Sequence, residues 1–546
     1  MGNCICDFKQ QRCGWKELRD RMGANLDLQD KYGWTALMID SRHSNTDSVI
    51  ETVKLLTGAG ANLNLQNKDG YTALMMASRY SNKESSNKTV KLLIEAGANL
   101  DLRQEQGWTA LTFASRYSNT DSSIETVKLL IEAGANLDLQ NKDKWTALMI
   151  ASRYSNTDSS IETIKLLIGA RANLNLRTYD GFTALMMASR YSNKESSNET
   201  AKSLIEAGAN LDLQEEEGFT ALMIASRHSN KESSNETVKL LIKAGANLDL
   251  QNKSGNTALM LASKYSNEES SNETVKLLIE AGANLDLQEI DGWTALMIAS
   301  RHSNKESSNE TVKLLIEAGT NLDLQNKEGF TALMIASRHS NKESSNETVK
   351  LLIEAGANLD LQNKDGWTAL MLASKYSNEE SLNETVKLLI EAGVNLDLQT
   401  NDGWTALMVA SQYSNILKSS RYSNIKSSSD TVKLLIEAGA NLDLQNKDGY
   451  TALMITSRYF GKACVTENTL IKTVKLLIEA GANLYLKNKD GKTVYRMIAN
   501  MEFREHLNEF VMLKVWKIRE LSTNKMYDAF SVYNIAGNVF LFLKPK

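Results

Sequence analysis

The chain has 546 residues, and its 62 lysines and arginines nearly balance its 66 aspartates and glutamates, giving a net charge of −4. Because charges of both signs are interspersed, this composition argues against bulk electrostatic attraction to nucleic acid. Four cysteines are too few for a disulfide framework and favour a reduced, intracellular setting, which we expect to be the cytoplasm. No apolar run approaches the roughly 18 residues that cross a bilayer, so we expect no transmembrane segment.

The first 32 residues differ from the rest of the chain. Residues 1–13 match no repeated pattern and are predicted to be an unstructured tail. Residues 14–32 look like a truncated copy of the later repeat, so we expect them to form the N-terminal cap that a stack of repeats needs. In the first full copy, Asp40 replaces the alanine of nearly all others, which suits the end of a stack better than its middle.

Residues 33–490 form an array of about twelve copies of a 37-residue unit, for which residues 329–365 serve as the reference. The copies begin at Gly33, Gly70, Gly107, Lys144, Gly181, Gly218, Gly255, Gly292, Gly329, Gly366, Gly403, Gly449 and, incompletely, Gly491. Self-similarity at a fixed period of 20 to 50 residues indicates a solenoid, in which each unit packs mainly against its neighbours.

The first half of the unit predicts a turn followed by a buried helix. Asp365 and Gly366 form a turn signal, because glycine allows the positive φ of a tight hairpin. Thr331 stands at the N-cap position, ahead of the apolar run Ala332–Ala336. A helix that is apolar nearly all round is expected between two neighbours.

The second half of the unit predicts a loop, an amphipathic helix and a short extended arm. Residues Ser340–Asn346 are polar and are predicted to be a loop, with Ser344 and Glu347 as a capping box that opens the second helix. Val349, Leu352 and Ile353 then recur at helical spacing. Gly356 is predicted to end that helix, and Leu359–Leu361 alternates like a short strand arm.

The pattern changes toward the C-terminus. Unit 403–448 is longer because Gln412–Ser420 and Arg421–Ser429 duplicate the loop, and unit 449–490 is lengthened at the same place, around Phe460–Leu470. Insertions at one register position map to one rim of a solenoid. From residue 491 to 546 the repeat decays, and we expect a degenerate last repeat and a C-terminal cap that includes the apolar strip Val539–Leu543.

The unit resembles the ankyrin repeat. The resemblance rests on Gly-x-Thr-Ala-Leu, on Val-Lys-Leu-Leu-Ile-Glu-Ala-Gly-Ala-Asn and on the hairpin between them. It implies a mostly α fold, an ankyrin-repeat α-solenoid of stacked helix pairs with short β-hairpin turns. The sequence departs from the family where Ala332 and Met334 replace its usual proline and histidine, and where the loop between helices is about four residues longer. The recurring Thr-Ala-Leu-Met sequence also resembles that of arrays encoded by giant DNA viruses of amoebae. This resemblance would place the protein in the host cytoplasm.

No catalytic or metal-binding constellation is recognisable. Gly491-Lys492-Thr493 imitates the end of a phosphate-binding loop, but Leu486 occupies the place of its first glycine. Four of the five histidines share one register position, where neighbours lie about 8–10 Å apart and cannot share a metal. We therefore expect a protein without enzymatic activity, catalytic residues, cofactor or metal.

The resemblance implies that a partner protein contacts the hairpin tips and the exposed ends of the first helices. Those places carry an aromatic residue after the glycine and, at the helix end, an arginine followed by tyrosine or histidine. The candidate partner-binding residues are Trp34, Tyr71, Arg79, Tyr80, Trp108, Arg116, Tyr117, Trp145, Arg153, Tyr154, Phe182, Arg190, Tyr191, Phe219, Arg227, His228, Trp293, Arg301, His302, Phe330, Arg338, His339, Trp367 and Trp404.

Two interpretations of these rows stay open. Tryptophan, tyrosine and arginine are enriched at binding hot spots, so the rows predict a surface for one or more proteins and not for nucleic acid. Alternatively, the aromatics pack hairpin against hairpin with arginine stacked on them. The near-identity of the units is also consistent with recent duplication, without a partner of matching period.

The function expected is that of a non-enzymatic scaffold for protein–protein interaction, acting on host proteins if the chain is viral. The alternative is an acylated, membrane-associated scaffold in which the array is a spacer. Gly2 could be myristoylated and Cys4 and Cys6 palmitoylated, giving the two anchors that stable attachment needs, although Cys6 replaces the usual serine or threonine. Membrane contact is expected only in that acylated form.

Overall fold

The computed structural model describes residues 25–43, 47–80, 84–117, 121–154, 158–190, 195–228, 232–265, 269–301, 306–339, 343–376, 380–413, 428–458 and 467–497. Helices are the only regular elements of this described part, in agreement with the predicted helical solenoid. Contacts divide the chain into two units, Met1–Asn284 and Leu285–Lys546, and each unit is described by itself. The predicted bounds of the tail, caps and array stay predictions.

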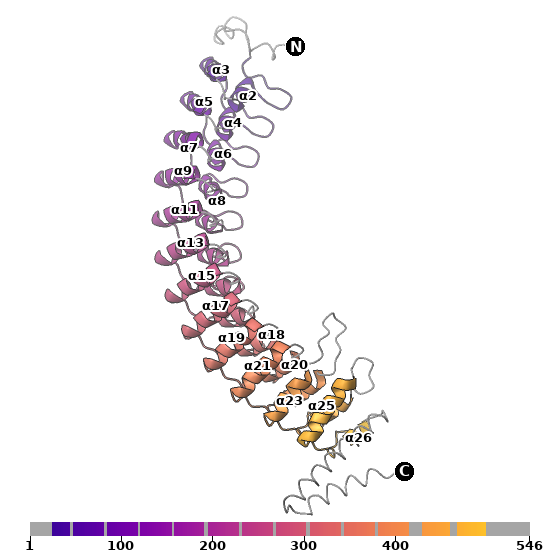
Figure 1. Cartoon of the computed structure of the whole chain (residues 1–546). Helices are drawn as coiled ribbons and strands as arrows, with labels where there is room; N and C mark the ends of the chain where they lie inside the picture. The colour runs from indigo at the N-terminus through magenta and orange to yellow at the C-terminus, as the bar shows by residue number, and fades with distance from the viewer. Residues whose placement is uncertain are drawn as a thin grey trace, which may run out of the picture. The chain divides into compact units, whose positions relative to one another are not determined.

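Each repeat contributes a short first helix and a longer second helix (Figure 1). In the first unit the first helices are α2 (Ala36–Arg42), α4 (Ala73–Arg79), α6 (Ala110–Arg116), α8 (Ala147–Arg153), α10 (Ala184–Arg190), α12 (Ala221–Arg227) and α14 (Ala258–Lys264). The second helices there are α3 (Asp47–Gly58), α5 (Glu84–Glu95), α7 (Asp121–Glu132), α9 (Asp158–Gly169), α11 (Glu195–Glu206), α13 (Glu232–Lys243) and α15 (Glu269–Glu280).

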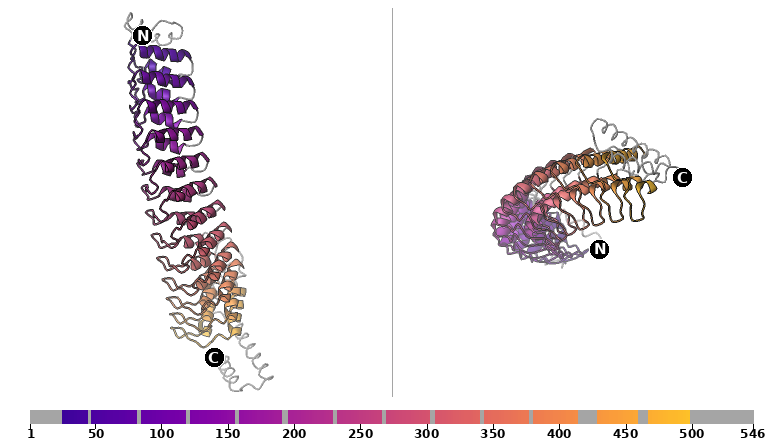
Figure 2. Two further views of the ribbon diagram at one scale, coloured as in Figure 1. Left: turned by 90° about the vertical axis from the view of Figure 1, so that its left-hand side faces the viewer. Right: turned by 90° about the horizontal axis from the view of Figure 1, so that it is seen from below.

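The second unit repeats the arrangement. Its first helices are α16 (Ala295–Arg301), α18 (Ala332–His339), α20 (Ala369–Tyr376), α22 (Ala406–Tyr413), α24 (Ala452–Arg458) and α26 (Val494–Met497). Its second helices are α17 (Glu306–Glu317), α19 (Glu343–Glu354), α21 (Glu380–Glu391), α23 (Ser428–Glu437) and α25 (Glu467–Ala480). Within a unit, first helices pack on first helices and second on second, which makes two layers (Figure 2).

The first helices form where a threonine cap precedes an apolar run. Thr331 Oγ1 accepts a hydrogen bond from the backbone N–H of Met334 at 3.3 Å, which confirms the predicted cap. Ala332, Leu333 and Met334 are each 1% exposed. The alanine and methionine that replace the family's proline and histidine therefore lie in the packed core, and the cap supplies the polar tie at the helix start.

The second helix begins earlier than predicted. Helix α19 begins at Glu343, so the predicted loop Ser340–Asn346 is wrong over its last four residues, and the capping box at Ser344 and Glu347 is wrong too. The first three residues of that loop lie outside the described part. One reason is tertiary: Asn346 Oδ1 accepts a hydrogen bond of 2.6 Å from Thr385 Oγ1 of the next repeat. A polar residue that gains a partner across the stack can be held inside a helix. The predicted apolar face is confirmed at Val349 and Leu352, both fully buried.

Glycines with positive φ make both turns of the repeat, as predicted. Gly356 ends α19 with a φ of 87°, and Gly366 forms the hairpin with a φ of 81°. The strand arm predicted at Leu359–Leu361 is wrong, because Leu359 and Asp360 form a turn. The backbone N–H of Asp360 donates to Asn358 Oδ1 at 3.0 Å, and this side-chain bond favours a turn over an extended arm.

Successive hairpins are joined by backbone and side-chain hydrogen bonds. Gln362 Nε2 donates to the carbonyl of Gly366 in its own hairpin and to that of Gln399 in the next, at 2.8 Å each. The backbone N–H of Asn401 donates to the carbonyl of Asp365 at 2.9 Å. We call this row of turns, at Gly70, Gly107, Gly366 and their equivalents, the hairpin edge of a unit.

Several predictions concern residues outside the described part. These are the tail with Gly2, Cys4 and Cys6, most of the N-terminal cap, residues 414–427 of the duplicated loop, residues 459–466 of the second insertion, the C-terminal segment 498–546, Tyr191, His302 and the side chain of His339. Asp40 is described, and its burial raises the pKa of the carboxyl to about 6 despite the opposing charge of His43.

Candidate functional site

The predicted row of aromatic residues lies along the hairpin edge, and its members are half-buried. In most hairpins a side-chain oxygen accepts a hydrogen bond from the backbone N–H of the aromatic residue. In two examples, the backbone N–H of Trp145 donates to Asn141 Oδ1 at 2.7 Å and that of Trp367 donates to Asn363 Oδ1 at 2.8 Å. The rings therefore start from a repeated backbone position, with part of each ring left in contact with solvent.

The cations at the ends of the first helices lie over these rings. Arg116 Cζ is 5.3 Å from the ring centroid of Trp108, and Arg153 Cζ is 5.2 Å from that of Trp145. The same pairing joins Arg42 to Trp34, Arg79 to Tyr71, Arg190 to Phe182, Arg227 to Phe219, Arg301 to Trp293, Lys375 to Trp367 and Arg458 to Tyr450. Distances below about 6 Å place them in cation–π contact.

The arginines also connect neighbouring repeats. Arg116 Cζ lies 5.3 Å from the ring of Tyr154 in the next repeat, and Arg42 lies 5.4 Å from Tyr80 in the same manner. Arg79 Nη1 in addition donates a hydrogen bond of 3.1 Å to Tyr71 Oη. The interpretation that arginine stacks on the hairpin aromatics is confirmed for these residues, and partner binding by the same residues stays a prediction.

At His228 a histidine stands after the arginine at the end of the first helix, where other repeats carry a tyrosine. Partial burial of its ring lowers the pKa of His228, and the positive charges of Arg227 and Arg190 lower it further. The ring is therefore neutral at pH 7, and it adds no positive charge to the row. Phe330 and Arg338 lie at the equivalent places of the reference repeat.

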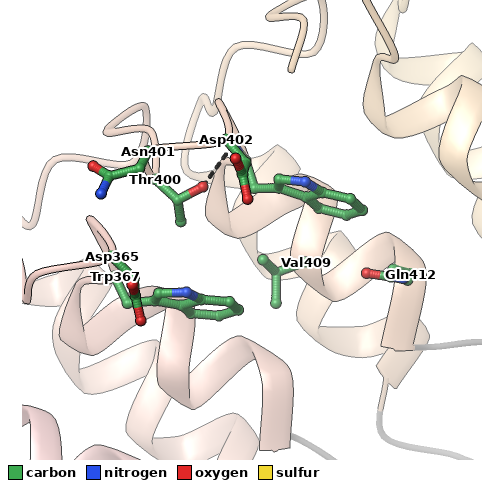
Figure 3. Close-up of a pocket in the computed structure, with 8 residues that line it drawn as sticks. Asp365, Trp367, Thr400, Asn401, Asp402, Val409 and Gln412 are labelled. Atoms are coloured by element: carbon green, nitrogen blue, oxygen red, sulfur yellow. Dashed lines mark hydrogen bonds between the residues drawn. The ribbon is translucent and has the colours of Figure 1, made fainter. Parts of the chain in front are cut away.

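A pocket of about 410 Å³ lies at the hairpin edge of the second unit, between two tryptophans that were predicted and next to residues that were not (Figure 3). Trp367 and Trp404 line it together with Asp402 and Gln412. A signal was present in the sequence, because Gln412 stands where the described repeats otherwise carry arginine or lysine. The sequence does not indicate that the change would leave a hollow.

No cluster of metal ligands and no membrane-crossing helix is found among the residues that the structure describes. Within them, no group of three or more His, Cys, Asp or Glu side chains is arranged to hold a metal ion. Within them too, none of the helices combines the length and the apolar character that crossing a bilayer requires.

Comparison with protein families gives a match over most of the sequence. A model described as ankyrin repeats (3 copies) matches residues 12–84, 44–136, 120–198, 193–271, 266–346 and 341–422, and a model described as ankyrin repeat matches residues 402–447. No curated protein matched the chain. The family matches cover far more than half of the sequence, and they agree with the stacked helix pairs and glycine hairpins of the structure. The chain belongs to the ankyrin-repeat family.

Proposed function

We propose that this protein is a scaffold that binds one or more partner proteins through its hairpin edge and the adjoining ends of its first helices. The observation that carries the proposal is the row of half-buried aromatic residues, most of which are stacked with a cation of the same repeat, as Trp108 is with Arg116 and Trp145 with Arg153. Ankyrin repeats typically mediate protein–protein interaction, which is consistent with this role.

The physical argument concerns the entropy of binding. An aromatic ring that is already held by a stacked arginine loses little freedom when a partner covers it, so more of the contact energy appears as affinity. Tryptophan, tyrosine and arginine also dominate the residues whose truncation weakens protein interfaces most. The second-helix surface of the same repeats instead exposes lysine and glutamate, for example Lys128 and Glu132, which are depleted at interface cores.

The experiment is affinity capture with the full chain from the cells that produce it, followed by mapping of the contact. We expect Arg116→Ala combined with Arg153→Ala to lower capture of the bound protein at least tenfold, because two stacked anchors are lost. The matched control is Lys128→Ala combined with Glu132→Ala, which alters the second-helix surface of the same region and should leave capture unchanged. Equal capture by both variants, with unchanged circular dichroism, contradicts the proposal.

The finer identity of the partner is part of the same proposal. The resemblance of the Thr-Ala-Leu-Met wording to arrays of giant DNA viruses of amoebae supports a host protein, met in the host cytoplasm. Capture from uninfected amoeba lysate tests it, and a partner encoded by the same genome as this chain contradicts it.

The acylated alternative rests on Gly2, Cys4 and Cys6. In that alternative, the lipid anchors determine the location and the array acts as a spacer. Gly2→Ala removes the myristoylation site, so the alternative expects the protein to leave the membrane fraction. An unchanged distribution between membrane and soluble fractions contradicts it.

A further inference from the structure

The pocket at the hairpin edge of the second unit combines aromatic walls with acidic groups. Trp367 and Trp404 line it from successive hairpins, and Val409 of α22 adds an apolar side chain to the lining (Figure 3). Asp365 and Asp402, each one residue before the hairpin glycine, add two carboxylates. The space of about 410 Å³ is large enough for the end of a long side chain, and its lining favours one that is flat and positively charged.

Other repeats of the chain show what occupies this kind of position. The hairpin tryptophans other than Trp404, among the described residues, each have a cation over the ring: these are Trp34, Trp108, Trp145, Trp293 and Trp367. In all but Trp367 the cation is an arginine. Trp404 has none within the described part of the chain, because the equivalent position in α22 is the neutral Gln412.

A second cation is missing from the hairpin that leads to Trp404. The hairpin position occupied by Lys364 in the preceding repeat and by Lys447 in the following one is Asn401 here. Asn401 Nδ2 donates a hydrogen bond of 2.7 Å to the carbonyl of Lys364, so its side chain joins two successive hairpins. Two neutral amides thus replace two cations beside Asp365 and Asp402, which makes the local potential more negative than in the neighbouring repeats.

We propose that this pocket binds an arginine side chain of a partner protein, which stacks on Trp404 and pairs with Asp402 or Asp365. The inference rests on the proposed function, since it names a feature that the partner presents to the same edge. Arginine is favoured over lysine because its planar guanidinium both stacks on an indole and forms two parallel hydrogen bonds with a carboxylate. Lys375 Nζ lies 4.8 Å from the centroid of the Trp367 ring, so we expect the arginine of the partner to stack on Trp404 instead.

The test is fluorine NMR of the full chain labelled with 5-fluorotryptophan, with the Trp404 signal assigned by Trp404→Phe. The probe is the peptide acetyl-Gly-Arg-Gly-amide, and its neutral match is the same peptide with citrulline. We expect the Trp404 signal to shift saturably with the arginine peptide, at roughly millimolar affinity for a single side chain, and not with citrulline. No saturable shift, an equal shift with citrulline, or a larger response to a lysine peptide overturns the proposal.

Two variants link the signal to the pocket. Gln412→Arg restores the cation of the other repeats and should abolish binding of the peptide by filling the pocket from within. Ala392→Arg adds the same charge at an exposed site after α21 and serves as its control. Asp402→Asn should weaken binding several-fold. Peptide binding that Gln412→Arg leaves unchanged overturns the proposal.

This experiment is independent of the search for a natural partner. If the arginine peptide fails to bind while Arg116→Ala with Arg153→Ala still abolishes capture, the pocket assignment is wrong and the scaffold function stands. If the peptide binds and capture does not depend on the hairpin edge, the pocket is real and the proposed function is wrong.

Discussion

The hairpin edge and the second-helix layer of the repeats are joined to their neighbours in different ways. At the hairpin edge, backbone atoms take part in nearly every link, as when the N–H of Lys142 donates to the carbonyl of Gln106 at 2.9 Å. In the second-helix layer, the polar links are between side chains, such as Thr237 Oγ1 donating to Asn198 Oδ1 at 2.6 Å. Links through the backbone persist when side chains change, and links between side chains do not.

The second-helix layer shows this dependence directly. The bond forms where the earlier of the two repeats supplies an asparagine, as between Asn87 and Thr126 at 2.7 Å. Ile124 stands at the asparagine position one repeat before Thr163, and the buried hydroxyl of Thr163 has no hydrogen-bond partner within the described residues. A buried hydroxyl without a partner costs about 1–3 kcal/mol, so the repeats are not equally stable despite their similarity.

The largest loss of stability is expected when a hairpin glycine, rather than a glycine at the end of a second helix, is replaced by alanine. Gly107 and Gly134 have nearly equal φ values, 83° and 84°. A Cβ on Gly107 would meet Asn141 Cα and Lys142 N at 2.9 Å, whereas one on Gly134 meets nothing within 4 Å. We expect Gly134→Ala to cost about 1 kcal/mol of stability from backbone strain, and Gly107→Ala about 3 kcal/mol because the next hairpin must also move.

Hydrogen exchange measured by mass spectrometry checks this prediction, because it reports the stability of residues 104–109 and 133–136 separately. Equal losses for the two variants would show that the close approach of the hairpins does not contribute to stability.

The same substitution should have opposite effects at two positions of the second-helix layer. Thr237→Val leaves Asn198 without its donor and should destabilise the first unit by about 1–2 kcal/mol. Thr163→Val replaces a hydroxyl that has no partner with a methyl group of the same shape, and should stabilise it by about 1 kcal/mol. Urea denaturation of the full chain measures both, and a loss of stability for Thr163→Val would contradict the explanation.

Asp40 should make the N-terminal end of the first unit sensitive to pH. Its pKa is raised from 3.8 to about 6 in the folded chain, because burial favours the protonated carboxyl. The folded chain therefore has its full stability below pH 3.8 and loses stability as the pH rises through 6 and the buried carboxyl ionises. Full conversion of this pKa change would be about 3 kcal/mol, which solvent screening of the partly exposed carboxyl reduces to about 1 kcal/mol.

We therefore expect Asp40→Ala to stabilise the protein by about 1 kcal/mol at pH 7 and to have no such advantage below pH 4. Thermal unfolding at both pH values measures the difference. Asp40→Asn keeps the shape without the charge and should remove the same pH dependence; an advantage of Asp40→Ala that is equal at both values excludes ionisation as its cause.

The smallest effect is expected where other residues occupy the glycine positions. Arg171 stands at the turn after α9 with a φ of 67°, and Lys144 at the hairpin with a φ of 60°. Replacing either by glycine removes backbone strain but increases the entropy of the unfolded chain, so the net gain should be about 0.5 kcal/mol. Lys144→Gly should gain more than Arg171→Gly, because hairpin glycines lie against the next hairpin. Urea denaturation compares the two, and the reverse order would contradict this account.

The sequence alone was sufficient for features that depend on local chemistry. The period, the threonine cap at Thr331, the glycine turns at Gly356 and Gly366 and the buried face at Val349 and Leu352 were all predicted. Each follows from the backbone φ of one residue, from a hydrogen bond within one helical turn or from the spacing of apolar residues. Each therefore depends on only a few neighbouring residues of the sequence.

Only the tertiary structure decided what depends on contacts between repeats. The start of α19 at Glu343 was missed because its polar first turns are linked to the next repeat through Asn346 and Thr385. The stacking of arginine on aromatic rings was one of two open interpretations. The pocket beside Trp404 depends on exchanges at residues 401 and 412 and on a wall that Asp365 and Trp367 supply from the preceding hairpin. A linear pattern records which residues repeat, whereas the space that they fill or leave open is set by neighbours about 37 residues away.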